Sequence, residues 1–495
     1  MKNILFKTVI LASAFFAISN IEAQSALDVL RLSDQTLIGT GRAAGTNTNM
    51  SGIGADFTTL SSNPAGIAQY RKSEIMLSPT VTHSNIESTL LGGSVGAPVD
   101  ESKTKFRLPN LGIVIAKEGR DNISYAFGFG VNGYMGSNQN FTFKGKSKGS
   151  ISERFAALAN GLELDELDNF EAGLAYDSEL LIEKRPDGSY SYDYENYKTT
   201  ELTKYQNVQS SGRYNEVAFS GGVNLTNKLL LGATIGVPTY RYNEAKVYQE
   251  LDKDEAVPFF DEIQFREYKA VSGTGINAKF GLFFKPINNL IIGAAVHSPT
   301  FIAITDDYST ELDYKFTFNN APVSNSFESP EATIDYTITT PMKLSGSIGG
   351  ILGKFGFVNA EVEYQDYSKS KIKIKAGENV INDNLVQDNI NADIKANYQK
   401  TVKVNFGAEV AAIPNFRLRA GIGFAKSPYV SESEFLPNFG FGAGYRNDYF
   451  FLDLAYRQWR SENGYEPYYI TEAAETLVSQ KLTQSAFVLT IGFKL

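Results

Sequence analysis

Apolar and polar residues alternate strictly in many segments of this chain. Near the C-terminus, Phe487, Leu489 and Ile491 share one face, whereas Val488 and Thr490 lie on the other. A period of two is typical of a β-strand, because successive side chains point to opposite faces. We therefore expect fourteen strands. Their approximate ranges are 73–83, 104–117, 122–145, 211–225, 228–251, 262–285, 289–314, 331–352, 355–375, 392–411, 416–427, 435–446, 449–461 and 480–495.

The second face of these strands separates two kinds of β-protein. A soluble sandwich also alternates, but its solvent face is usually rich in Lys, Glu and Thr. Here the face opposite the large apolar side chains is mostly Gly, Ala, Ser or Asn, as at Asn405, Gly407, Gly421 and Gly423. Such residues are typical of the lumen of a closed barrel whose apolar face meets lipid.

The connections between the expected strands alternate between short and long. Short ones read LTNK, PINN and IPN, whereas long ones cover residues 146–210 and 462–479. Outer-membrane barrels have this alternation, with an even number of strands, short periplasmic turns and long outer loops. The pattern predicts an all-β fold, a 14-stranded antiparallel transmembrane β-barrel in residues 73–495. Closure would leave no free edge strand.

Charged residues on the expected lumen face fall in complementary sets. A tight turn after residue 411 would place Glu409 opposite Arg419, and a turn near residue 353 would bring Lys343 close to Glu363. Inside a narrow barrel such pairs fill space and fix the strand register. We favour this structural role over a catalytic one. The arginines expected in the lumen, which alternatively meet a ligand carboxylate, are Arg213, Arg417 and Arg419.

Residues 1–23 predict a cleaved secretory signal. They combine Lys2 and Lys7 with an almost wholly apolar run and a small residue, Ala23, at the expected cleavage point. The apolar run is too short to cross ~30 Å of hydrocarbon as a helix. We therefore expect an exported protein of the Gram-negative outer membrane.

The motif formed by Asn63, Pro64, Ala65 and Gly66 is turn-like, although no strand precedes it. Pro64 fixes its own φ angle and moves Asn63 towards extended geometry, and Gly66 allows a close backbone approach. We interpret the motif as a hinge or stopper ahead of the barrel.

Composition excludes several classes of site. The formal net charge is −9, from 46 basic and 55 acidic residues, so nucleic-acid binding has no electrostatic support. There is no cysteine and there are only two histidines, His83 and His297, which removes disulfides, thiolate zinc sites and His-rich metal sites. We expect no cofactor and no metal.

The run GTGRAAGTNTNMSGIGADFTTLSSNPAGIA, followed in order by TPMKLSGSIGGIL, VNAEVEYQDYSKS, VKVNFGAEV, FRLRAGIGFAKSPY and FGFGAGYRNDYFFLDLAY, resembles the FadL/TodX family of outer-membrane transporters for hydrophobic compounds. The resemblance implies that residues 24–72 form a hatch that plugs the barrel. It also implies a monomer that takes a hydrophobic ligand, such as a long-chain fatty acid, into a lumenal pocket. The ligand would leave passively into outer-membrane lipid, through a gap at an inward kink of the third strand.

Two local features bear on that mechanism. The third strand carries Gly130, Asn132, Gly133 and Gly136, and glycine within a strand marks a bend or a close approach. These residues are the candidate kink and gate; alternatively, the glycines only ease barrel curvature. No ligand-binding residue of the family can be matched in the loop 146–210.

That loop contains a predicted amphipathic helix after an N-capping Ser150. Phe155, Leu158 and Leu162 would lie on its apolar side. They are a candidate outer capture site for an apolar ligand, and the alternative, which we favour slightly, is a helix packed on its own loop.

Two other functions stay open at this point. A hydrolase would need a nucleophile and a base, but His297 and the adjacent Ser298 point to opposite faces of a strand, so we expect no enzyme. Relatives of such barrels also act as carriers in protein secretion. Long outer loops fit that alternative, whereas the hatch fits small-molecule passage.

Overall fold

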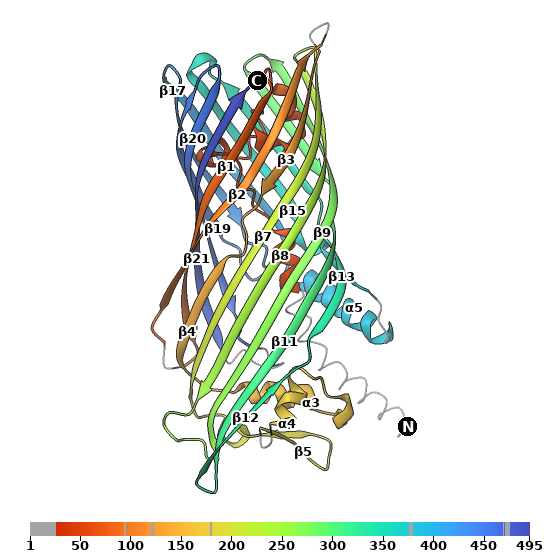
Figure 1. Ribbon diagram of the computed structural model, residues 1–495, viewed down its shortest axis with the longest axis vertical. Coiled ribbons are helices and arrows are strands. Elements are labelled where there is room, and N and C mark those ends of the chain that lie inside the picture. The colour runs from red at the N-terminus through yellow and green to blue at the C-terminus, as the bar shows by residue number, and fades with distance from the viewer. Residues whose placement is uncertain are drawn as a thin grey trace.

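The alternating segments form one closed antiparallel β-barrel (Figure 1). The computed structural model describes residues 26–93, 96–119, 123–178, 181–375, 380–468, 470 and 476–495, so the predicted signal, residues 1–23, lies outside the described residues. Nineteen strand segments make fourteen wall strands, because four wall strands consist of two or three segments each. β1 and β21 close the ring, pairing Glu74 with Lys494 at one end and Leu91 with Leu477 at the other. The predicted fold class is confirmed.

The wall strands follow one another in chain order. They are β1 (Glu74–Leu91), β2 (Val99–Glu118), β3 (Ser124–Gly133) with β4 (Gln139–Ser147), β7 (Leu202–Leu225), β8 (Leu229–Leu251), β9 (Phe260–Ile287), β10 (Leu290–His297) with β11 (Phe301–Phe318), β12 (Ala321–Glu328) with β13 (Ala332–Thr339) and β14 (Lys343–Ile351), β15 (Gly356–Asp366) with β16 (Lys371–Ile374), β17 (Lys400–Ile413), β18 (Phe416–Lys426), β19 (Phe435–Arg446), β20 (Phe450–Tyr465) and β21 (Leu477–Lys494). Short 3₁₀ turns, η5 (Gly353–Phe355) and η6 (Tyr367–Lys369), flank β15.

The outer surface of the barrel is apolar. On β20, Phe450, Leu452 and Leu454 are exposed, whereas Asp453 and Ala455, which alternate with them, are buried on the lumen side. The same alternation holds on β18 and β21. A continuous band of exposed large apolar side chains is the surface that a barrel turns to lipid.

The barrel is much taller on one side than on the other, as Figure 1 shows. β7, β8 and β9 have 24, 23 and 28 residues, whereas β17, β18 and β19 have 14, 11 and 12. Since ~9–11 residues cross a membrane, the long strands extend well beyond it at the rim that carries the long connections. We call this end the loop rim and the opposite end the turn rim.

A small domain, which we call the loop domain, is built at the loop rim between β4 and β7. It contains α3 (Ile151–Ala159), η3 (Leu164–Glu166), α4 (Ala172–Asp177), β5 (Ile182–Lys184), β6 (Tyr190–Tyr192) and η4 (Glu195–Tyr197). Its apolar residues share one buried cluster with the ends of β8, β9 and β11, including Tyr248, Phe265 and Leu312. The tall wall therefore serves as the base of this domain.

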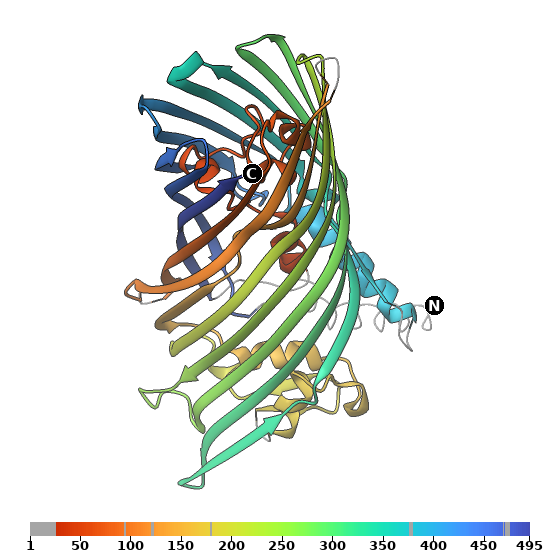
Figure 2. The same cartoon turned by 45° about the horizontal axis from the view of Figure 1, so that its top comes forward.

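The lumen is filled by residues 26–72, which we call the hatch; its segments lie inside the ring of strands in Figure 2. It contains a helix at residues 26–33, α2 (Gly41–Gly45), η1 (Phe57–Leu60) and η2 (Pro64–Gln69). Among the described residues, no helix is long and apolar enough to cross a membrane.

Hatch and wall fit closely because many wall residues that face the lumen have small side chains or none. A Cβ atom added to Gly421 would lie 1.8 Å from the carbonyl oxygen of Thr46, and one added to Gly232 would lie 2.2 Å from Pro64. Any larger residue at these wall positions would collide with the hatch backbone. The small residues that the sequence places on the lumen face are therefore explained by close packing against the hatch.

Several predicted boundaries were wrong. The strand expected at residues 392–411 begins only at Lys400, because α5 (Val380–Asn397) precedes it. The side chains of Ile390 and Ile394 are one helical turn apart and share a buried cluster with Leu30 of the hatch. This burial favours a helix over a strand at these residues. The strands expected at 73–83 and 211–225 extend to Leu91 and back to Leu202, since pairing continues beyond the membrane.

Candidate functional site

The third wall strand is broken between β3 and β4, and the hatch occupies the break. The backbone N–H of Met135 donates to Thr36 O (2.8 Å), and the N–H of Ile38 donates to Gly133 O (3.1 Å). These two bonds place Leu37 opposite Tyr134 as an isolated antiparallel bridge. A piece of the hatch thus pairs with the wall where the wall strand is interrupted.

Glycines make this geometry possible. A Cβ atom on Gly136 would lie 2.2 Å from the carbonyl oxygen of Gly212, and one on Gly133 would lie 2.4 Å from the Cβ of Pro109. Gly130 lies three residues before Gly133 in β3 and is the cross-strand partner of Gly112 in β2. Asn132 is buried, and its amide donates to Ser61 Oγ of the hatch (2.9 Å). The candidate gate residues therefore lie together at the contact between β3 and the hatch.

The neighbouring strand β2 stops pairing with the third wall strand where β3 ends. β2 pairs with β3 only from Leu111 to Glu118, and β4 pairs only with β7. Among the described residues, the segment 99–110 of β2 has no strand partner on that side. Side chains bridge the two edges instead, with Lys103 Nζ donating to Asn140 Oδ1 (2.8 Å). The wall is thus interrupted as a hydrogen-bonded ladder beside the hatch.

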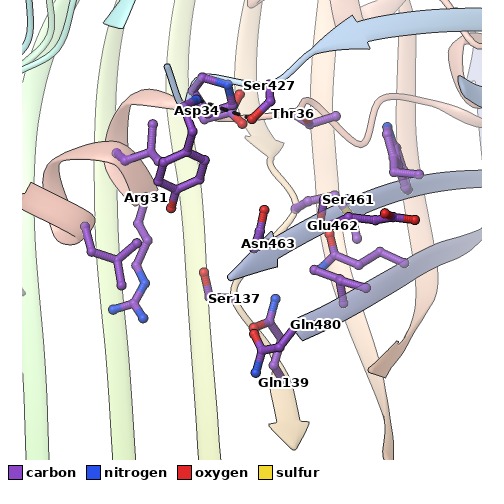
Figure 3. Close-up of a pocket in the computed structure, with 18 of the residues that line it drawn as sticks. Arg31, Asp34, Thr36, Ser137, Gln139, Ser427, Ser461, Glu462, Asn463 and Gln480 are labelled. Atoms are coloured by element: carbon purple, nitrogen blue, oxygen red, sulfur yellow. Dashed lines mark hydrogen bonds between the residues drawn. The ribbon is translucent and has the colours of Figure 1, made fainter. Parts of the chain in front are cut away.

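A cavity of about 370 Å³ reaches this break from the lumen. Figure 3 shows Arg31 and Asp34 of the hatch on one side and Ser137 of the break below them. Asn463 and Gln480, at the loop-rim ends of β20 and β21, face them across the cavity. The cavity therefore joins hatch, break and the short side of the barrel.

Several charged groups of the cavity pair with one another. Arg31 lies 2.9 Å from Asp28, and Lys403 lies 2.6 Å from Asp34. Lys269 bridges Asp28 to a wall aspartate of β11. The pairs made by Lys403 and Lys269 hold this part of the hatch against both sides of the wall.

Neutral amides of the cavity are less well satisfied. Gln480 Nε2 and Gln35 Oε1 are buried and have no hydrogen-bond partner among the described residues. Buried polar atoms are nearly always paired, so an unpaired donor and an unpaired acceptor in one cavity are suited to the polar end of a ligand or to water.

An aromatic row packs against the hatch helix on the tall side of the barrel. The rings of Tyr134 and Tyr214 are 5.0 Å apart in an edge-to-face arrangement, and Tyr240 and Tyr242 are stacked at 6.4 Å. The guanidinium of Arg31 lies 4.5 Å above the ring of Tyr242. These contacts anchor the helix next to the break, because cation–π and aromatic pairs both favour this geometry.

The motif Asn63 to Gly66 begins η2. Asn63 is extended (φ −137°, ψ 101°), its side chain accepts from Ala65 N, and Pro64 takes the first helical position. The Asn63 amide also donates to the carbonyl oxygens of Ser51 and Ala294, both at 3.3 Å. The motif thus connects two parts of the hatch to β10, and its role as a hinge or stopper remains a prediction.

The predicted lumen charges lie in one buried network. Arg419 Nε is 2.7 Å from Glu409 Oε2, in the cross-strand register that the sequence predicts, and Arg419 Nη1 is 2.6 Å from Asp453 Oδ1. Arg417 Nε lies 4.0 Å from Glu409. Arg42 of the hatch also contacts Glu409 (3.3 Å). The geometry is that of a structural ion-pair network.

Arg213 corrects one expectation. It is exposed on the outer face of β7, together with Phe219, whereas Tyr214 and Glu216 face the lumen. The predicted parity was wrong by one residue because the polar composition of residues 206–216 gives no apolar alternation from which to assign faces.

The loop helix is packed rather than open. Phe155 and Leu158 are buried in the core of the loop domain, and the Phe155 ring contacts that of Phe265 at 5.4 Å. Ser150 caps the helix as expected, and Leu162 is half-buried beyond its end. The alternative of a helix packed on its own loop describes this arrangement.

The two histidines contact other groups than Ser298. His297 contacts the carbonyl oxygen of Ser62 at 2.6 Å, and Ser298 Oγ donates to Pro299 O and accepts from Ala278 N. His83 contacts Thr104 on the exposed outer face. His297 therefore joins the hatch to the wall.

Sequence reasoning missed the polar cavity. Gln480 begins an expected strand, Asn463 falls in the expected connection 462–479, and no helix is predicted at residues 26–33. No local signal marks them, because they meet only when strands far apart in the chain close into a ring.

Solved structures with a similar fold include transport proteins. A FadL homologue of Pseudomonas aeruginosa superimposes with a TM-score of 0.54 at 13% identity, covering 93% of this chain and 98% of that one. The toluene transporter TodX of Pseudomonas putida gives 0.53 at 13% identity, covering 93% and 99%. The toluene transporter TbuX of Ralstonia pickettii gives 0.50 at 14% identity, covering 91% and 99%. No protein-family model and no curated protein matches the chain. The likeness shows a shared fold.

Proposed function

We propose that this chain is an outer-membrane channel that takes up hydrophobic molecules passively and releases them sideways into the membrane. The observation that carries the proposal is the cavity that extends from the lumen to the break in the third wall strand. The apolar outer surface and the fold shared with known transporters of hydrophobic compounds support it. The loop rim would face the outside, and the predicted signal would direct export.

The ligand we propose is an amphiphile, such as a long-chain fatty acid, rather than a pure hydrocarbon. Its carboxylate would accept a hydrogen bond from the unpaired amide nitrogen of Gln480, and its chain would extend towards the break at Gly136. Moving apolar surface from water into the pocket and then into lipid stabilises it by about 25 cal/mol per Å². Partition down a gradient therefore needs no energy source.

Release would require the bridge between Leu37 and Tyr134 to open, because the hatch occupies the break. This pair is of the non-hydrogen-bonded kind, in which Cα atoms are ~4.5 Å apart, close enough for a disulfide. The chain contains no cysteine, so Leu37→Cys with Tyr134→Cys introduces a single possible bond.

We expect the oxidised double variant to lose uptake of radiolabelled oleate and the reduced protein to regain it. Each single cysteine variant is the control for the substitutions themselves. Uptake that is equal in the oxidised and reduced forms, with the disulfide verified by mass spectrometry, would show that this bridge does not gate transport.

A carrier role in protein secretion is the second candidate. Phe259, in the connection between β8 and β9, is 61% exposed, and Phe318, at the turn between β11 and β12, is 48% exposed; their rings lie 6.4 Å apart. Exposed aromatic pairs are typical of contact sites. Co-purification of an exported protein that is lost in Phe259→Ser with Phe318→Ser would favour this function, whereas co-purified fatty acid would favour transport.

A further inference from the structure

A polar patch begins where the outer surface of four adjacent strands stops being apolar. The strands are β7, β8, β9 and β11, which lie side by side in Figure 1. Two cross-strand rows form the patch and line a surface hollow of about 640 Å³. In pairing order the rows are Asn215, Thr239, Thr274 and Ala303, then Arg213, Arg241, Ser272 and Thr305.

The height of the patch is that of lipid head groups. On β8 the outward apolar face runs from Leu229 to Val237, a length close to the ~9–11 residues that cross a membrane. Thr239 follows at once, and Arg241 lies four residues beyond Val237. With a rise of ~3.3 Å per residue along a tilted strand, Arg241 lies roughly 10 Å above the apolar belt, on the loop-rim side.

Two like charges are paired directly within the patch. Arg213 and Arg241 are cross-strand partners, and both are exposed on the outer face. In the part of the chain that the structure describes, neither guanidinium lies within ion-pair distance of a carboxylate. Like charges directly opposite each other destabilise a sheet, so the arrangement calls for an anion.

Closer to the loop rim on the same wall, an arginine is paired with carboxylates. Arg266 of β9 lies 3.2 Å from Glu311 and 2.8 Å from Asp313, so the protein supplies its own carboxylates there. The unpaired arginines are thus confined to the level where a membrane supplies phosphate.

We propose that Arg213 and Arg241 bind the phosphate group of a lipid in the leaflet at the loop rim, with the hydroxyls of Thr239, Ser272 and Thr274 around it. Guanidinium groups match phosphate oxygens with paired, charge-assisted hydrogen bonds. The bound lipid would remove the repulsion between the two arginines and fix the height of the tall wall in the membrane. This inference depends on membrane insertion and is independent of what the channel transports.

The test compares the full chain with the variant Arg213→Gln with Arg241→Gln. The matched control is Lys117→Gln with Lys228→Gln, which removes two exposed positive charges at the turn rim. Barrels in neutral detergent receive phosphatidylglycerol, diacylglycerol with the same acyl chains, or inorganic phosphate. Lipid retention is read by native mass spectrometry, and stability by thermal unfolding, with heat-modifiable gel mobility as the check of folding.

We expect the wild type and the turn-rim control to retain phosphatidylglycerol and to unfold at a higher temperature with it. The arginine variant should retain about tenfold less, and without lipid it should be at least as stable as the wild type. Equal retention by wild type and arginine variant would overturn the proposal. So would stabilisation by diacylglycerol or by inorganic phosphate equal to that by phosphatidylglycerol. If the double variant does not fold, Arg241→Gln alone serves the same comparison.

Discussion

Glu361 of β15 is a wall residue whose side chain binds backbone N–H groups of the hatch. Its carboxylate accepts from the N–H groups of Asn49 (2.8 Å) and Ser51 (2.7 Å), and also from the Asn359 amide (2.8 Å). Both hatch donors are satisfied by one side chain that is 6% exposed. Replacing Glu361 with Gln keeps the shape but leaves a single acceptor oxygen. One hatch N–H then faces an amide NH₂ group.

The size of the effect follows from this geometry. A hydrogen bond to a charged group contributes ~1.5–3 kcal/mol, and leaving a buried donor unpaired costs ~1–3 kcal/mol. We take the loss as about 2–3 kcal/mol for this part of the hatch. Since each 1.4 kcal/mol is a factor of ten, the population with hatch residues 49–51 detached should rise about 30- to 150-fold.

The assay is single-channel conductance in planar bilayers, read as the fraction of time in conducting states. Glu363→Gln is the matched control. Glu363 lies two residues along on the same strand and face, but it pairs with Lys343 of the wall (3.2 Å). Glu361→Gln should conduct far more often than wild type or Glu363→Gln. Equal conductance of the two variants would refute the reasoning that Glu361 holds the hatch closed.

Three further predictions concern the wall and the loop domain. Arg419→Met leaves two buried carboxylates without their shared partner and should lower the free energy of unfolding in urea by ~3–5 kcal/mol; an unchanged midpoint would contradict a structural network. Gly281→Val places carbon atoms where Asn63 Oδ1 lies, 2.0 Å from an added Cβ, and should displace the hatch and make cells sensitive to a large polar antibiotic. Gly221→Val should not if expression is equal, because an added Cβ there meets nothing closer than the Phe127 ring at 3.7 Å. Burial raises the pKa of Asp193 in the loop domain to about 7. Because the folded domain then holds its proton more tightly than the unfolded chain does, its stability should fall as pH rises from about 4 to about 7. Protease resistance of the loop domain should therefore be greater at pH 5 than at pH 8, and Asp193→Asn should remove that difference.

The barrel could be predicted from patterns along the chain. Alternation in segments such as residues 450–456 assigned the lipid and lumen faces, and the spacing of Glu409 and Arg419 predicted a cross-strand pair that the structure contains. Both signals are local, because a strand's side-chain period and a tight turn are properties of a few consecutive residues. Where apolar alternation was missing, as around Arg213, the assignment of faces was wrong.

The meeting of the wall break with a cavity could not be predicted in this way. Glycines in the third strand were compatible with either a kink or simple curvature. The choice depends on Pro109 and Gly212 on neighbouring strands and on hatch residues 36–38, about a hundred residues away in the chain. The cavity likewise combines Arg31 with Gln480, which ring closure brings together. Contacts of that kind arise from packing between distant segments, so no local pattern along the chain encodes them.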